Sequence, residues 1–156
     1  MKQLPVGAVA PDFTLQLLSG REFRLSDQLA YGPLVLAFYK ASCPTCQLTF
    51  PYLQRIYSEL GNNTKYRIVG ISQDDPAETK DFVDGVGIGF DVAIDEHPYS
   101  VSSTYGLEFV PTIFLIGRDG KIQLSDYGFS KATLLEIAGP LQLFSPEDGL
   151  PAIRPG

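Results

Sequence analysis

Apolar residues along the chain form two kinds of pattern: continuous runs, and residues that recur at helical spacing. The runs "PLVLAFY" at 33–39 and "YRIVGIS" at 66–72 are continuous, which is typical of strands buried on both faces of a sheet. Between them, apolar residues recur at helical spacing over 53–60, and "GNN" at 61–63 is expected to end that helix. The pattern therefore predicts a strand, a helix and a second strand in succession.

Further patterns predict the elements on either side. Residues 13–25 alternate as a β-hairpin does, with the turn at Ser19–Gly20. The other predicted elements are a helix at 75–87, a short strand at 91–94, a short helix at 99–106, a hairpin at 112–127 and a last helix at 131–141. Strands that alternate with helices predict an α/β fold, with parallel strands at the centre of a mixed β-sheet flanked by helices and an antiparallel edge.

The length of 156 residues is that of one ordinary domain, which we expect to span residues 1–145. Residues 146–156 are rich in proline and glycine and are expected to be loop or disordered. A net charge of −6 argues against nucleic acid as a partner, and no apolar run reaches the roughly 18 residues of a transmembrane helix. The opening residues show no signal peptide, so we expect a cytoplasmic protein as the chain stands, or an extracytoplasmic one if a leader was removed.

The two cysteines, Cys43 and Cys46, are separated by two residues and follow the first buried strand. A structural disulfide between them would close a very short loop and add little stability. A structural zinc site needs four ligands, and the single histidine, His97, lies in a loop-like segment, so we expect no metal. A reactive dithiol is the favoured interpretation.

The position of the pair suits a reactive thiol. If Cys43 is the N-cap of the following helix, Pro44 is its first residue, where a missing N–H is no loss. The N–H groups of Thr45 and Cys46 then point back at the Cys43 sulfur and, with the helix dipole, favour its thiolate form. We expect Cys43 to attack a substrate and Cys46, one helical turn inward, to resolve the product.

With these motifs, the chain resembles the thioredoxin-like superfamily over roughly residues 5–145. Three segments carry the resemblance: "GAVAPDFTL", "FYKASCPTC" and "FVPTIFLIGRDGKI". The resemblance is to the branch of alkyl hydroperoxide reductase/thiol-specific antioxidant (AhpC/TSA) proteins, and within it to TlpA/ResA-type thiol–disulfide oxidoreductases. It implies a thioredoxin-like fold, a cis-proline at Pro111 beside the dithiol, substrate contacts at Val110 and Pro111, and a kink in the active-site helix at Pro51.

The chain departs from the family pattern at the positions of the usual buried carboxylates, which are Ala37 and Thr49 here. The group that takes the proton from Cys46 is therefore not identified by the resemblance. Supporting roles are open for Lys40 near Cys43, Tyr39 as packing beside the dithiol, and Glu108. We expect Asp74 and Asp75 to cap the helix that begins near Pro76, Thr112 to be an ordinary strand residue, and Ser42 to replace the usual tryptophan.

The predicted function is thiol–disulfide exchange with a protein disulfide or dithiol, without a cofactor and with an unidentified upstream thiol reductant or oxidant. A cleft beside a cis-proline would offer backbone groups to an extended partner chain. Two alternatives stay open. The first is a peroxiredoxin-like thiol peroxidase with an antioxidant role, although the family's threonine and arginine correspond to Lys40 and Pro111 here. The second is a non-catalytic binding module with the same fold.

Overall fold

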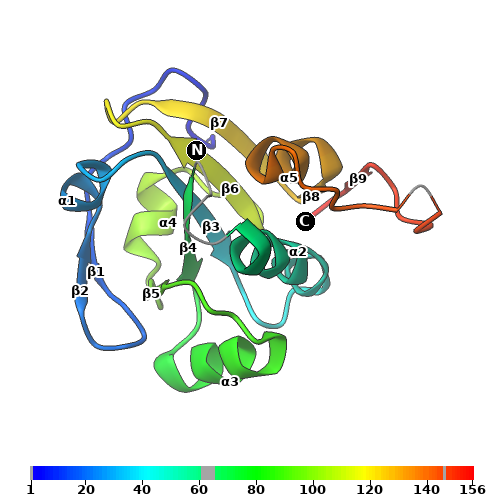
Figure 1. Cartoon of the computed structure of the whole chain (residues 1–156). Helices are drawn as coiled ribbons and strands as arrows, with labels where there is room; N and C mark the ends of the chain where they lie inside the picture. Colours follow the sequence, from blue (N-terminus) through cyan, green and yellow to red (C-terminus); the bar gives the residue numbers. More distant parts are fainter. Residues whose placement is uncertain (1, 61–65, 146) are drawn as a thin grey trace.

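A five-stranded mixed sheet forms the centre of the computed structural model, which describes residues 2–60, 66–145 and 147–156 (Figure 1). Its strand order is β5-β4-β3-β6-β7. β3 (Leu34–Tyr39) pairs in parallel with β4 (Arg67–Ser72), and β4 pairs in parallel with β5 (Val92–Ile94). β6 (Thr112–Ile116) and β7 (Ile122–Tyr127) complete the sheet as an antiparallel edge. The predicted mixed sheet is thereby confirmed.

The remaining elements surround this sheet. A separate hairpin pairs β1 (Thr14–Gln16) with β2 (Glu22–Arg24), as predicted. The helices are α1 (Leu25–Leu29), α2 (Pro44–Leu60), α3 (Pro76–Val86), α4 (Ser100–Thr104) and α5 (Lys131–Ala138). The pattern did not predict α1, and the "GNN" expected to end α2 lies outside the described residues.

Alternate residues of β3 point into two separate layers of the core. Val35, Ala37 and Tyr39 belong to the layer beneath α2, α3 and α5. Leu34, Leu36 and Phe38 belong to the layer beneath α1, α4 and the β1–β2 hairpin. Every residue of β3 is fully buried, which explains the continuous apolar run, because a strand covered on both faces has no polar side.

Residues 147–156 are more ordered than expected. A short strand β9 (Ile153–Arg154) pairs antiparallel with β8 (Phe129–Ser130), so Phe129 lies opposite Arg154 and Ser130 opposite Ile153. The expectation of loop or disorder was wrong at these two residues. Two-residue strands bury little and give almost no periodic signal, so hydrophobic patterning does not predict them.

A matched pair of leucines tests the assignment of the core. Leu53 in α2 is fully buried, whereas Leu135 in α5 is 44% exposed. We expect Leu53→Ala to lower the free energy of unfolding by about 2–5 kcal/mol, because truncation leaves a cavity. Leu135→Ala should cost about 1 kcal/mol or less. Urea unfolding measures both changes, and equal losses would contradict the proposed packing of α2.

Candidate active site

The two cysteines lie where β3 gives way to α2. The carbonyl of Cys43 accepts the Gln47 N–H at 3.0 Å, the first hydrogen bond of the helix, so Cys43 is the N-cap. Pro44 is the first helical residue, as predicted. The Cys43 N–H donates to the Lys40 carbonyl at 3.1 Å and closes the short loop that follows the strand.

Two backbone groups hold the Cys43 sulfur. The Cys46 N–H donates to Cys43 Sγ at 3.3 Å, which is one of the two donors expected from the helix N-terminus. The Cys43 thiol donates in turn to the Val110 carbonyl at 3.4 Å. Because the first bond comes from α2 and the second from the segment before β6, the sulfur is fixed between two elements that are distant in sequence.

Cys46 is in a different environment. It is completely buried in the layer beneath α2, whereas Cys43 is partly exposed, and both are free thiols. Burial is the main cause that raises the pKa of Cys46 far above its usual range. The backbone N–H of Lys40 opposes this shift, while the charges of Cys43 and Asp74 add to it. The site therefore contains one accessible thiol and one shielded thiol.

The Val110–Pro111 segment forms the other side of the site. The peptide bond between these residues is cis, as the resemblance implied. Pro111 is buried and Val110 is partly exposed. The Thr112 hydroxyl donates to the Phe109 carbonyl at 2.7 Å at the start of β6, which agrees with the expectation of an ordinary strand residue.

The side chains on either side of the dithiol have structural contacts. The ring of Tyr39 packs against Phe50 and Phe82, with centroids 4.4 and 4.7 Å apart, as expected for packing beside the dithiol. The ammonium group of Lys40 lies 5.9 Å from the ring centroid of Tyr99. This places Lys40 in a cation–π contact.

The residues at the usual carboxylate positions contribute no acid. Ala37 is buried in β3, and the Thr49 hydroxyl donates to the Thr45 carbonyl at 2.8 Å within α2. Glu108, which we also considered, is exposed. Pro51 lies inside α2, at the position expected from the resemblance.

A buried carboxylate reaches the site from the residues that follow β4. Asp74 is 6% exposed and accepts the Ala41 N–H at 2.7 Å, so it holds the loop between β3 and Cys43. The expected helix cap is correct for Asp75, whose side chain accepts the Glu78 N–H, and wrong for Asp74. Only one side chain can occupy the N-cap, and β4 runs parallel to β3, so Asp74 reaches the same sheet edge as the dithiol.

Two further findings concern a metal site and a membrane-spanning helix. Within the described ranges, no group of three or more potential metal-binding side chains occurs, and the ring of His97 lies 5.5 Å from that of Tyr99. Among the helices that the structure describes, none combines the length and apolar character needed to cross a bilayer.

Residues 6–125 match the model of the AhpC/TSA family. The chain belongs to the AhpC/TSA family. Proteins similar to this chain include the thiol-disulfide oxidoreductases ResA of Geobacillus thermodenitrificans and Bacillus thuringiensis. The first is 33% identical over 119 residues, covering 76% of this chain and 67% of the relative. The second is 30% identical over 146 residues, covering 93% and 82%.

A solved structure supports the same relationship and the thioredoxin-like fold. The putative thiol:disulfide interchange protein DsbE from Chlorobium tepidum superposes with a TM-score of 0.75 at 30% identity. The match covers 86% of this chain and 95% of that protein. The AhpC/TSA resemblance seen in the sequence motifs is therefore confirmed for both family and fold.

Asp74 offers a test of the electrostatics around Cys46. Its negative charge raises the pKa of Cys46, so Asp74→Asn, which keeps an acceptor for Ala41, should lower that pKa. In a Cys43→Ser background at pH 8, each unit of lowering would raise the alkylation rate of Cys46 about tenfold through its thiolate fraction.

The neighbouring Asp75→Asn variant is the matched control for this experiment. It removes the same charge from an exposed position and retains a good capping residue for α3. We expect the alkylation rate of Cys46 to stay close to that of the background protein. Equal effects of the two substitutions would show that Asp74 has no special influence on the thiol.

Proposed function

We propose that the protein is a thiol–disulfide oxidoreductase that exchanges electrons with protein disulfides or dithiols through Cys43 and Cys46. One observation carries the proposal. A partly exposed thiol at a helix N-cap accepts the backbone N–H of a second, fully buried cysteine at 3.3 Å. This arrangement combines an accessible nucleophile with a resolving thiol that stays out of solvent. The family membership and the names of the relatives support the same activity.

The exchange proceeds in two displacements. The Cys43 thiolate attacks one sulfur of a partner disulfide, forming a mixed disulfide and releasing the other partner sulfur as a thiolate. Cys46 loses its proton and attacks Cys43 Sγ, so a Cys43–Cys46 disulfide forms and the second partner sulfur leaves. Two electrons pass from the dithiol to the partner, and the released thiolates take up protons. The reverse sequence oxidises a partner dithiol.

Side chains around the site favour a protein as the partner. Phe109 and Tyr127 are 47% and 48% exposed, and their rings stack with centroids 5.2 Å apart. They directly precede Val110 and Gly128, respectively. Exposed aromatic pairs of this kind are common in protein interfaces, because they bury much apolar area at little cost in side-chain entropy. An upstream thiol reductant or oxidant would restore the redox state of the pair after each cycle.

A trapping experiment tests the two roles. Cys46→Ser leaves Cys43 able to attack but removes the resolving thiol, so a mixed disulfide with a peptide disulfide should accumulate. Cys43→Ser should form none, because the remaining thiol is buried and its pKa is raised. Intact-mass spectrometry detects the adduct. The assignment is wrong if Cys46 forms the adduct faster than Cys43.

Comparison with hydrogen peroxide tests the peroxidase alternative. Rapid cleavage of a peroxide bond needs donors for both oxygens, and loss of one such donor typically costs about 10²–10³-fold in rate. The position of the peroxiredoxin threonine is held here by Lys40, which contacts Tyr99. The position of the peroxiredoxin arginine is held by Pro111. We expect stopped-flow measurements on the reduced protein to give a larger rate constant with a peptide disulfide than with hydrogen peroxide. Fast peroxide consumption that disappears in Cys43→Ser would instead identify a peroxidase.

A further inference from the structure

The segment 147–156, named here the tail, returns across the molecule to β8. Besides the pairing of β9 with β8, the Lys131 N–H donates to the Ala152 carbonyl at 2.9 Å. Figure 1 shows the tail coming back past β8, with the C-terminus beside α2. The tail therefore follows the edge of the structure toward the dithiol.

The last two tail residues contact both sides of the active site. The hydroxyl of Thr45, the residue just before Cys46, donates to the Pro155 carbonyl at 2.8 Å. The backbone of Gly156 lies so close to the Val110 carbonyl that a side chain there would collide with it. That carbonyl is also the acceptor of the Cys43 thiol. The tail therefore contacts the Thr45 hydroxyl and the Val110 carbonyl, which lie close to the Cys43 sulfur.

The same close approach explains Gly128. Its φ is +76°, and a Cβ at this position would collide with the carbonyl oxygen of Arg154. A residue with a side chain would be strained in its own backbone and would also displace the tail. The fold therefore has space for an extended chain along β8 because position 128 has no side chain.

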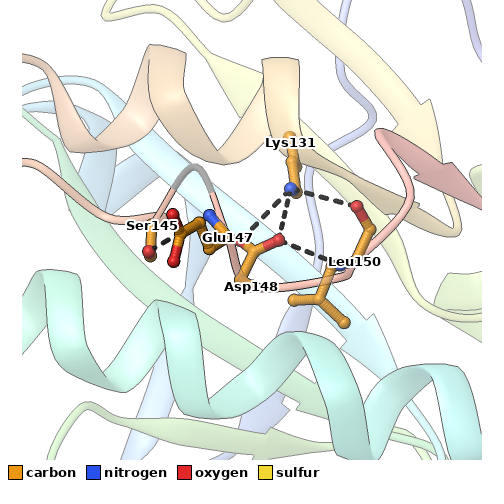
Figure 2. Close-up of polar contacts among 5 residues, drawn as sticks. All are labelled: Lys131, Ser145, Glu147, Asp148 and Leu150. Carbon is orange, nitrogen blue, oxygen red and sulfur yellow. Dashed lines mark hydrogen bonds and ion pairs between the residues drawn. The ribbon is translucent and has the colours of Figure 1, made fainter.

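An ion pair anchors the start of the tail (Figure 2). Lys131 Nζ lies 3.1 Å from Asp148 Oδ1 and donates to the Leu150 carbonyl at 3.2 Å. Asp148 also accepts the Leu150 N–H at 2.9 Å. Its side chain is 17% exposed and that of Lys131 is 21% exposed, so solvent screens this pair less than the surface pairs of the chain.

Beyond this anchor the tail is weakly held. Residues 151–156 are all exposed, and β9 is two residues long. A strand of this length buries too little to be stable without its anchor. The contacts are mostly main-chain contacts, which an extended peptide of another protein could also make.

We propose that the tail is a displaceable cover of the redox surface, held by the Lys131–Asp148 pair and removed when an extended segment of a protein partner takes its place along β8. The proposal rests on the proposed function, because it assumes that Cys43 attacks a partner disulfide. A partner segment lying along β8 would present its disulfide to Cys43 while its backbone replaces that of residues 153–156.

Two tail variants and one control test this cover. Asp148→Asn removes the ion pair of the anchor while the chain keeps its tail, and deletion of 147–156 removes the tail. Asp84→Asn is the control, because it breaks the exposed Lys80–Asp84 pair, which lies in α3. We expect both tail variants to react with a peptide disulfide at least threefold faster than the wild-type protein in stopped-flow experiments. The control should stay within twofold of the wild type.

The outcomes separate this proposal from the proposed function. Asp148→Asn should also speed amide hydrogen exchange at Lys131, whose N–H the tail binds. A wild-type protein that reacts through Cys43, with tail variants less than threefold faster, overturns the cover and leaves the oxidoreductase intact. Absence of a Cys43-dependent reaction in the wild-type protein and in both tail variants would overturn the oxidoreductase itself.

Discussion

Burial of β3 between two layers of side chains determines where the Cys43 sulfur lies. Since all six residues of the strand are buried, the chain leaves the core at Tyr39 and must turn at once into α2. That turn places Cys43 at the helix N-cap, where the Cys46 N–H reaches its sulfur. The parallel partner β4 ends at the same edge and brings in Asp74. The positions of the α2 N-terminus, the Asp74 carboxylate and the Cys43 thiol therefore all follow from where β3 and β4 end.

Sequence patterns were sufficient for most of the central fold. The apolar run of β3, the helical spacing of α2 and the hairpin β6–β7 were predicted because each signal comes from residues close together in the chain. The N-cap position of Cys43 was also predicted, since it depends on local geometry. Polar contacts between distant segments gave no such signal. Asp74 and the tail belong to this second group.

The case of Asp74 shows why such contacts escape sequence analysis. Two adjacent aspartates precede Pro76, and both suit a helix cap by residue type. Their separation into one cap and one buried acceptor depends on the position of Ala41, 33 residues away. Tail contacts pose the same difficulty over longer distances, because the partner of Pro155 is Thr45. Only the assembled sheet brings these groups together.

The contrast in exposure between the two thiols also determines how the site responds to oxidative damage. An oxidant from solvent would reach the partly exposed Cys43 before the buried Cys46 and would convert the Cys43 thiolate to a sulfenic acid. Cys46 lies one helical turn away and can condense with that sulfenic acid, giving a disulfide that thiols reduce again. Oxidation to the irreversible sulfinic and sulfonic acids must therefore compete with an intramolecular reaction. In the proposed exchange, the buried cysteine would therefore protect its neighbour as well as resolve the mixed disulfide.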